Sequence, residues 1–170
     1  MKPLTNPFFV KFIIYFNDNQ DFFEGHEVLE DYWNSIPDRT KEHPLTGYIL
    51  LSTSMYHWRR GNAVGALRTI KKAQQKMASM VSTAPEFTEG IDFDDLLKNI
   101  DKVIRAIQEN RPFQPFSIKV LLPEIRQSIV EISAALELLP AGSEAVVHKH
   151  LLRDRTEIIR IRDEKKRGRD

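Results

Sequence analysis

The sequence predicts an all-α protein of about seven helices, packed in a single orthogonal or bundle-like domain. Every long apolar segment repeats with helical spacing, and none alternates convincingly as a strand would. Capping residues and proline or glycine stops separate these segments. A chain of 170 residues suits one ordinary domain, which buries about 70% of the surface that it exposes when unfolded.

The first two helices are marked by their start signals. Asn6 followed by Pro7 combines a capping side chain with proline at the first helical position, which predicts a helix to about residue 16. After the polar segment NDNQD, Asp21 or a neighbour can cap a second helix over 22–35. Pro37 stops that helix, because the residue before a proline avoids the helical conformation.

The third and fourth helices meet at a Gly-Asn pair. We expect the third helix over 45–60, with Gly61 in the left-handed conformation at its end. Asn62 then caps the fourth helix. The apolar stripe of this fourth helix, which we expect to be buried, consists of Val64, Leu67, Ile70, Met77 and Val81.

The second half of the chain predicts three more helices and at most one short strand. An Asp-rich start opens a fifth helix over 92–111. The prolines that follow favour an extended chain, and residues 117–122 could form a lone strand. A sixth helix is expected over 123–139 and a last helix over 144–165.

Composition excludes several classes of protein. With no cysteine there is no disulfide framework, no thiolate metal site and no cysteine nucleophile. The apolar start of the chain is short and is interrupted by Lys11, so we expect a core helix there rather than a targeting segment. No stretch approaches the roughly 20 apolar residues that cross a bilayer. We therefore expect a cytoplasmic protein that has no membrane partner.

Charge is distributed unevenly along the chain. From Lys149 to Asp170 there are 9 basic and 5 acidic residues, whereas the remaining residues carry a net charge of −3. This basic end could contact nucleic acid or another polyanion. Acids interrupt it and aromatic residues are absent from it, so a solvated helix is the alternative. The basic residues concerned are Arg153, Arg155, Arg160, Arg162 and Lys165 to Arg167.

The most informative stretch is FFEGHEVLEDYW, because it places polar groups beside the apolar face of the second helix. Helices two and three should form an antiparallel hairpin in which the numbers of facing residues add up to about 80 to 83. This register places His57 opposite His26 and Thr53 opposite Glu30. His26 and Glu30 lie one turn apart on the same side of their helix.

Two chemical interpretations of this cluster remain open. His26, Glu30 and His57 could bind one Zn, Fe or Mn ion with positions left for water, and Glu27 could act as the general base of a hydrolase. Alternatively, the same side chains form a buried polar network that fixes the helix register. Position 30 is Glu where a zincin helix has its second His, and the Glu-x-x-His pairs of di-iron bundles are absent.

These segments resemble a bacterial and archaeal domain-of-unknown-function family, number three-oh-nine, over about residues 10–85. The resemblance implies an all-helical fold and no established activity. It assigns residues 1–111 to the family's helical core and residues 112–170 to a C-terminal helical extension with a basic last helix. The matching positions are Phe16, Asn17, His26, Glu27, Glu30, Trp33, Gly47, His57, Gly61, Asn62, Gly65 and Ala66.

Three functional hypotheses follow, and the first is preferred. In the first hypothesis, the chain is a non-catalytic interaction or structural module with a buried His–Glu cluster and an unknown protein partner. The segment GNAVGALRTIKKA, which resembles one tetratricopeptide repeat, favours this hypothesis. The second hypothesis is that the chain is a metal-dependent hydrolase. The third is that it binds polyanions through its last helix. Under the first hypothesis Trp33 is a core anchor and Asn62 a helix cap.

Overall fold

The computed structural model describes residues 2–149, and this part of the chain is all-α, as the sequence predicts. It contains two short 3-10 helices, η1 (Pro3–Thr5) and η2 (Pro85–Phe87). The α-helices are α1 (Pro7–Asn17), α2 (Phe22–Asn34), α3 (Leu45–Arg59), α4 (Ala63–Thr83), α5 (Phe93–Gln108), α6 (Pro123–Ser133) and α7 (Glu144–Val147).

Side-chain caps start four helices at the positions that the sequence marks. In each, a side-chain oxygen accepts a hydrogen bond from a backbone N–H of the first turn, which would otherwise lack a partner. At Asn62 this bond comes from Gly65 and is 3.1 Å long. Gly61 has a φ of +83°, the expected left-handed conformation. The other caps are Asn6 with Phe8, Asp21 with Glu24 and Asp92 with Asp95.

A histidine ring caps α3. Nδ1 of His43 accepts a hydrogen bond of 3.1 Å from the backbone N–H of Leu45. The ring packs edge-on against Phe87, with centroids 5.2 Å apart. Burial lowers the pKa of His43, which favours the neutral ring. The neutral ring is the form whose Nδ1 can accept this bond.

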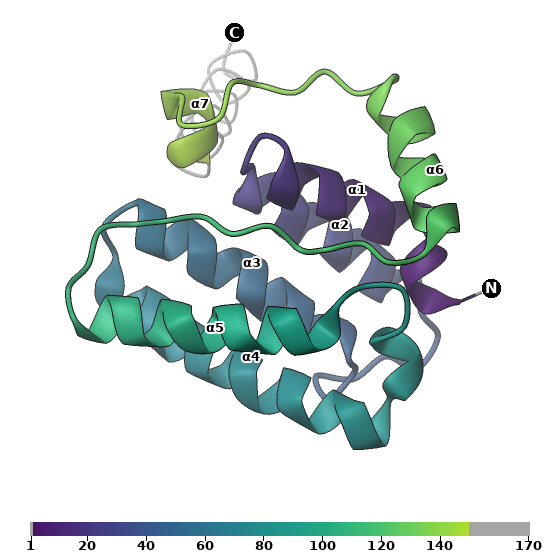
Figure 1. Cartoon of the computed structure of the whole chain (residues 1–170), viewed down its shortest axis with the longest axis horizontal. Coiled ribbons are helices and arrows are strands. Elements are labelled where there is room, and N and C mark those ends of the chain that lie inside the picture. Colours follow the sequence, from purple (N-terminus) through teal and green to yellow (C-terminus); the bar gives the residue numbers. More distant parts are fainter. Residues whose placement is uncertain (1, 150–170) are drawn as a thin grey trace, which may run out of the picture.

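The helices form two pairs, α1 with α2 and α3 with α4, and α3 lies between α2 and α4 (Figure 1). α5 packs on α4, and α6 packs on α1. Within residues 2–149, no helix combines the length and the apolar character that a bilayer span requires. α3 therefore lies in the centre of the arrangement, with α2 on one side and α4 on the other.

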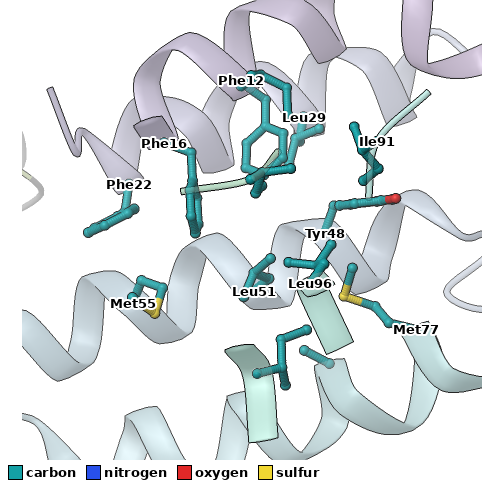
Figure 2. Close-up of a cluster of buried hydrophobic side chains, with 14 of the residues drawn as sticks. Phe12, Phe16, Phe22, Leu29, Tyr48, Leu51, Met55, Met77, Ile91 and Leu96 are labelled. Carbon is teal, nitrogen blue, oxygen red and sulfur yellow. The ribbon is translucent and has the colours of Figure 1, made fainter. Parts of the chain in front are cut away.

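Aromatic rings fill the space between the two helix pairs. Phe12 and Phe16 from α1 point toward Tyr48 and its neighbours on α3 (Figure 2). Phe9 also meets Tyr48 edge-on, with centroids 4.9 Å apart. Tyr48 is fully buried, and its hydroxyl donates a 2.7 Å hydrogen bond to the carbonyl of Phe87. Burial raises the pKa of Tyr48, so its hydroxyl remains a donor.

Residues 109–122, which we call the crossing segment, lead from the end of α5 back across α3 to α6 (Figure 1). The side chain of Asn17 holds this segment by donating to the carbonyl of Ile118 at 2.9 Å and accepting from its N–H at 2.8 Å. Ile91 and Val120 form the one β-bridge of the described residues. The short strand expected here is therefore reduced to a single pair.

The buried stripe of α4 differs from the expected one. Val64 and Val81 are 79% and 55% exposed. α4 has 21 residues, about 30 Å of helix, and these two valines lie near its ends. Small residues in the stripe allow close packing against α3 and α5. The buried residues of the stripe are Ala66, Ile70, Ala73, Met77 and Met80.

The sixth helix is shorter than predicted, because it ends at Ser133. Leu139, expected on its buried face, is 42% exposed. Its carbonyl accepts a 3.1 Å hydrogen bond from the side chain of Asn19. Pro140 also disfavours a helical conformation at position 139. The chain therefore leaves the helix and turns toward the loop between α1 and α2.

Candidate functional site

His26, Glu27 and Glu30 form one polar group on α2. Nε2 of His26 lies 3.0 Å from Oε1 of Glu30, and Nδ1 lies 3.6 Å from Oε1 of Glu27. One ligand atom from each side chain lies within 4.8 Å of the other two. Within residues 2–149, this is the one group of three or more His, Asp or Glu side chains whose ligand atoms lie close enough together to hold a metal ion.

This group lies on the surface, at the edge of the buried face of α2. The exposed fractions of its three side chains, in chain order, are 24%, 39% and 42%. The buried face is formed instead by residues such as Gly25, Val28 and Leu29. The expectation of a buried His–Glu cluster is therefore wrong. Because solvent screens the charges, the His26–Glu30 pair contributes about 0.3–0.5 kcal/mol when His26 is protonated.

His57 lies outside this group because α2 and α3 pair in a different register from the expected one. Gly25 lies against Ser52, so that a Cβ at Gly25 would be only 2.9 Å from the Ser52 hydroxyl oxygen. That hydroxyl donates a 2.7 Å hydrogen bond to the carbonyl of Phe22. The numbers of Gly25 and Ser52 add up to 77, whereas those of His26 and His57 add up to 83. His57 therefore lies more than one helical turn beyond the position opposite His26. The structure thus brings together the three candidates on α2.

The remaining predicted site residues make local contacts. The hydroxyl of Thr53 donates to the carbonyl four residues earlier in its own helix, at 2.9 Å. Asn62 caps α4, and its Nδ2 lies 3.4 Å from Nδ1 of His57. Trp33 is half-buried against the core, and its Nε1 donates a 3.1 Å bond to the carbonyl of Thr40.

The polar group on α2 has a donor set that suits a divalent metal. One imidazole and two carboxylates suit Zn, Fe or Mn and leave positions open for water. Glu27 was expected to act as a separate general base. Its carboxylate also lies close enough to His26 and Glu30 to serve as a third ligand. In that case the group contains no additional carboxylate to serve as the base.

A larger hollow lies between α5 and the crossing segment. Its volume is about 690 Å³, within the usual range for ligand sites. A second hollow of about 300 Å³ adjoins it, and Trp58, Arg111 and Pro112 line both. Sequence reasoning missed this site because the return of the crossing segment over α3 depends on distant contacts. The available signal was the basic and aromatic composition of KVIRAIQENRPFQPF.

The lining of the larger hollow is basic and aromatic. Lys102 and Arg105 come from α5, and Arg111 comes from the crossing segment. All three residues are exposed. Trp58 from α3 and Phe116 form part of the apolar wall. This combination can contact anionic and apolar groups at the same time.

The end of the described chain docks beside the start of α2. α7 begins at Glu144, where the last helix was predicted, but it ends at Val147, because His148 leaves the helical conformation. The rest of the predicted helix, from residue 150 to 165, lies outside the described residues. Nζ of Lys149 lies 2.6 Å from Oδ2 of Asp21. Arg59 donates a 3.3 Å hydrogen bond to the carbonyl of Val146. The predicted polyanion contacts also lie outside the described residues: Arg153, Arg155, Arg160, Arg162 and Lys165 to Arg167.

The fold and these surfaces define an all-α protein whose α2 carries a His-Glu-x-x-Glu sequence. Residues 9–69 match the model of a family described as a domain of unknown function (DUF309), which confirms the resemblance found in the sequence. The chain is also 27% identical, over 176 aligned residues, to the uncharacterized protein YpuF of Bacillus subtilis (strain 168). That alignment covers 95% of this chain and 97% of the relative. No solved structure is a significant match.

Proposed function

We propose that the protein is a cytoplasmic, non-catalytic module that binds another protein through the hollow between α5 and the crossing segment. The observation that carries this proposal is the 690 Å³ volume of the hollow together with its basic and aromatic lining. Trp and Arg are enriched among the residues that dominate protein interfaces. In this proposal the polar group on α2 is a surface network.

The proposal also gives a role to the division of the chain into a core of residues 1–111 and an extension of residues 112–170. The hollow would lie at the junction of these two parts. α5 supplies Lys102 and Arg105 from the core, whereas Gln114 and Phe116 come from the extension. Binding sites occur preferentially at such junctions, because two walls of different origin can enclose a ligand.

Site-specific photo-crosslinking in cells tests this proposal. Gln114, an exposed residue of the hollow, is replaced by a photoreactive phenylalanine derivative. Gln75 on α4 is the matched control, because it is also an exposed glutamine and does not line either hollow. We expect position 114, and not position 75, to give an adduct with one defined protein. Equal adducts at the two positions, or none at position 114, would contradict the proposal.

The compact group on α2 favours a second candidate function, a metal-dependent hydrolase. Its revised ligand set is His26, Glu27 and Glu30, whose ligand atoms lie within 4.8 Å of one another. A metal there would activate a bound water for attack on a substrate. His57 would then be dispensable for metal binding, in contrast to the ligand set expected from the sequence.

Metal content, measured by plasma mass spectrometry on protein purified without chelator, tests this second candidate. We expect about one equivalent of Zn, Fe or Mn in the unmodified protein. The His26→Ala variant should lose the metal, whereas the His57→Ala variant should retain it. Loss in both variants would restore the original ligand set. Absence of metal from the reloaded protein would eliminate the hydrolase.

A further inference from the structure

We infer that the occupant of the hollow is an acidic peptide segment of the partner, with an apolar side chain flanked by carboxylates. This inference rests on the proposed function and specifies the chemistry of the partner. Its first support is the charge of the lining. Lys102, Arg105 and Arg111 line the larger hollow, and none of its lining residues within the described part of the chain carries a carboxylate.

The cations remain available to a ligand. Lys102 makes no ion pair with any residue from 2 to 149. Arg105 contacts Asp101 at 2.5 Å and Arg111 contacts Glu109 at 2.6 Å, but these pairs are largely exposed and neither acid lines the hollow. Solvent screening makes such surface pairs weak, so a partner's carboxylates can compete for the guanidinium groups.

The cations occupy two walls of the hollow. Lys102 and Arg105 are three residues apart on α5 and therefore lie on one face of that helix. Arg111 lies on the crossing segment, which runs back alongside α5 (Figure 1). Carboxylates on both sides of a bound segment can therefore meet a positive charge. A single phosphate or carboxylate would satisfy only one part of this distribution.

The apolar part of the lining is fixed in position before any ligand binds. Trp58 is only 7% exposed and packs edge-on against Phe113, with ring centroids 5.1 Å apart. Phe116 packs in the same way against Phe16, at 5.2 Å. Immobilised rings lose little entropy when they contact a ligand, which favours an aromatic or aliphatic anchor. A polyanion without apolar groups would leave this wall unused.

The shape of the site indicates a chain rather than a compact small molecule. The larger hollow of about 690 Å³ is joined to the smaller one of about 300 Å³ by shared lining residues. These are Trp58, Arg111 and Pro112. The two hollows therefore adjoin at the start of the crossing segment and form one surface there. An extended peptide can follow that surface while its anchor occupies the larger hollow.

Tryptophan fluorescence provides a direct test. The chain has two tryptophans, so a Trp33→Phe variant leaves Trp58, in the wall of the hollow, as the single reporter. The probe is an end-capped hexapeptide of Asp and Glu around one Phe. A neutral probe replaces its acids by Asn and Gln, and a polyglutamate probe lacks the Phe. We expect the acidic hexapeptide to change Trp58 emission, with an affinity that falls as salt rises.

Charge reversal locates the binding site in the same Trp33→Phe background. Lys102→Glu combined with Arg105→Glu should weaken binding of the acidic hexapeptide at least about tenfold, because attraction becomes repulsion. Lys71→Glu with Lys72→Glu is the matched control, since it makes the same charge change on the exposed side of α4. Binding by this control should be unchanged. Equal weakening by both double variants would overturn the inference.

The other two probes separate the alternatives. At least about tenfold weaker binding of both the neutral and the polyglutamate probes would support the inference, because each lacks one half of the required chemistry. Polyglutamate that binds as tightly as the hexapeptide would overturn the apolar anchor. A neutral probe that binds as tightly would overturn the charge requirement. If an adduct forms at position 114 and no probe binds, this inference fails while the proposed function stands.

Discussion

Replacing Tyr48 with alanine is expected to lower the free energy of unfolding by about 4 kcal/mol. The ring is fully buried, and it packs edge-on against Phe9 and Phe12 at centroid distances of 4.9 Å and 6.1 Å. Its removal leaves a cavity where α1 faces α3, which the surrounding helices can fill only in part (Figure 2). It also removes the hydroxyl that satisfies the carbonyl of Phe87.

The Tyr48→Phe variant is the control, because it keeps the ring and removes only the hydroxyl. It should cost about 1–2 kcal/mol, the effect of one buried hydrogen bond. Urea unfolding followed by circular dichroism gives both values. For a chain of this length, the alanine variant should also melt about 10–15 °C lower. If the two variants were equally destabilised, packing of the ring would contribute nothing.

The predictable parts of the fold depend on residues close together in the sequence. Asn62 and Gly61 were assigned correctly as caps because each acts on backbone within three or four residues. The end of α6 was predicted six residues too late, at 139 instead of 133. Beyond that end, a hydrogen bond from Asn19 holds the carbonyl of Leu139 outside the helix. Such a distant contact has no local signal in the sequence.

The candidate site shows the same limit. The contact between His26 and Glu30 follows from their spacing on one helix, and the structure contains it at 3.0 Å. The position of His57 instead required the register of α2 against α3. Gly25 and Ser52 set that register by allowing the two helices to approach closely, and hydrophobic periodicity does not specify such a contact. The hollow beside Trp58 was missed because it depends on the path of the crossing segment.

Replacing Asp21 with alanine is the second change with a large expected effect, about 3 kcal/mol of unfolding free energy. The side chain of Asp21 is 2% exposed, and it joins the start of α2 to Lys149 at the end of the described chain. Its Oδ1 caps α2 through the N–H of Glu24 at 3.1 Å, and its Oδ2 meets Nζ of Lys149 at 2.6 Å. Asp21 also opposes the lowering of the Arg59 pKa by burial. Alanine removes the cap and leaves Lys149, which is 17% exposed, without this partner.

The Asp21→Asn variant separates the two roles, because its amide oxygen can still cap α2 while its charge is lost. Val146 is the one fully buried residue of α7, so apolar packing of this short helix is limited. Two buried polar atoms beside it, Oγ of Ser143 and Nε of Arg59, lack hydrogen-bond partners among residues 2–149. We therefore expect docking of α7 to depend on the ion pair between Lys149 and Asp21, which is shorter, at 2.6 Å, than the contact of Lys149 with Glu24 at 3.5 Å. Hydrogen exchange should show faster exchange of the Val146 amide in both variants, with slow exchange of α2 amides retained only in Asp21→Asn. Unchanged protection at Val146 would mean that apolar packing alone holds α7.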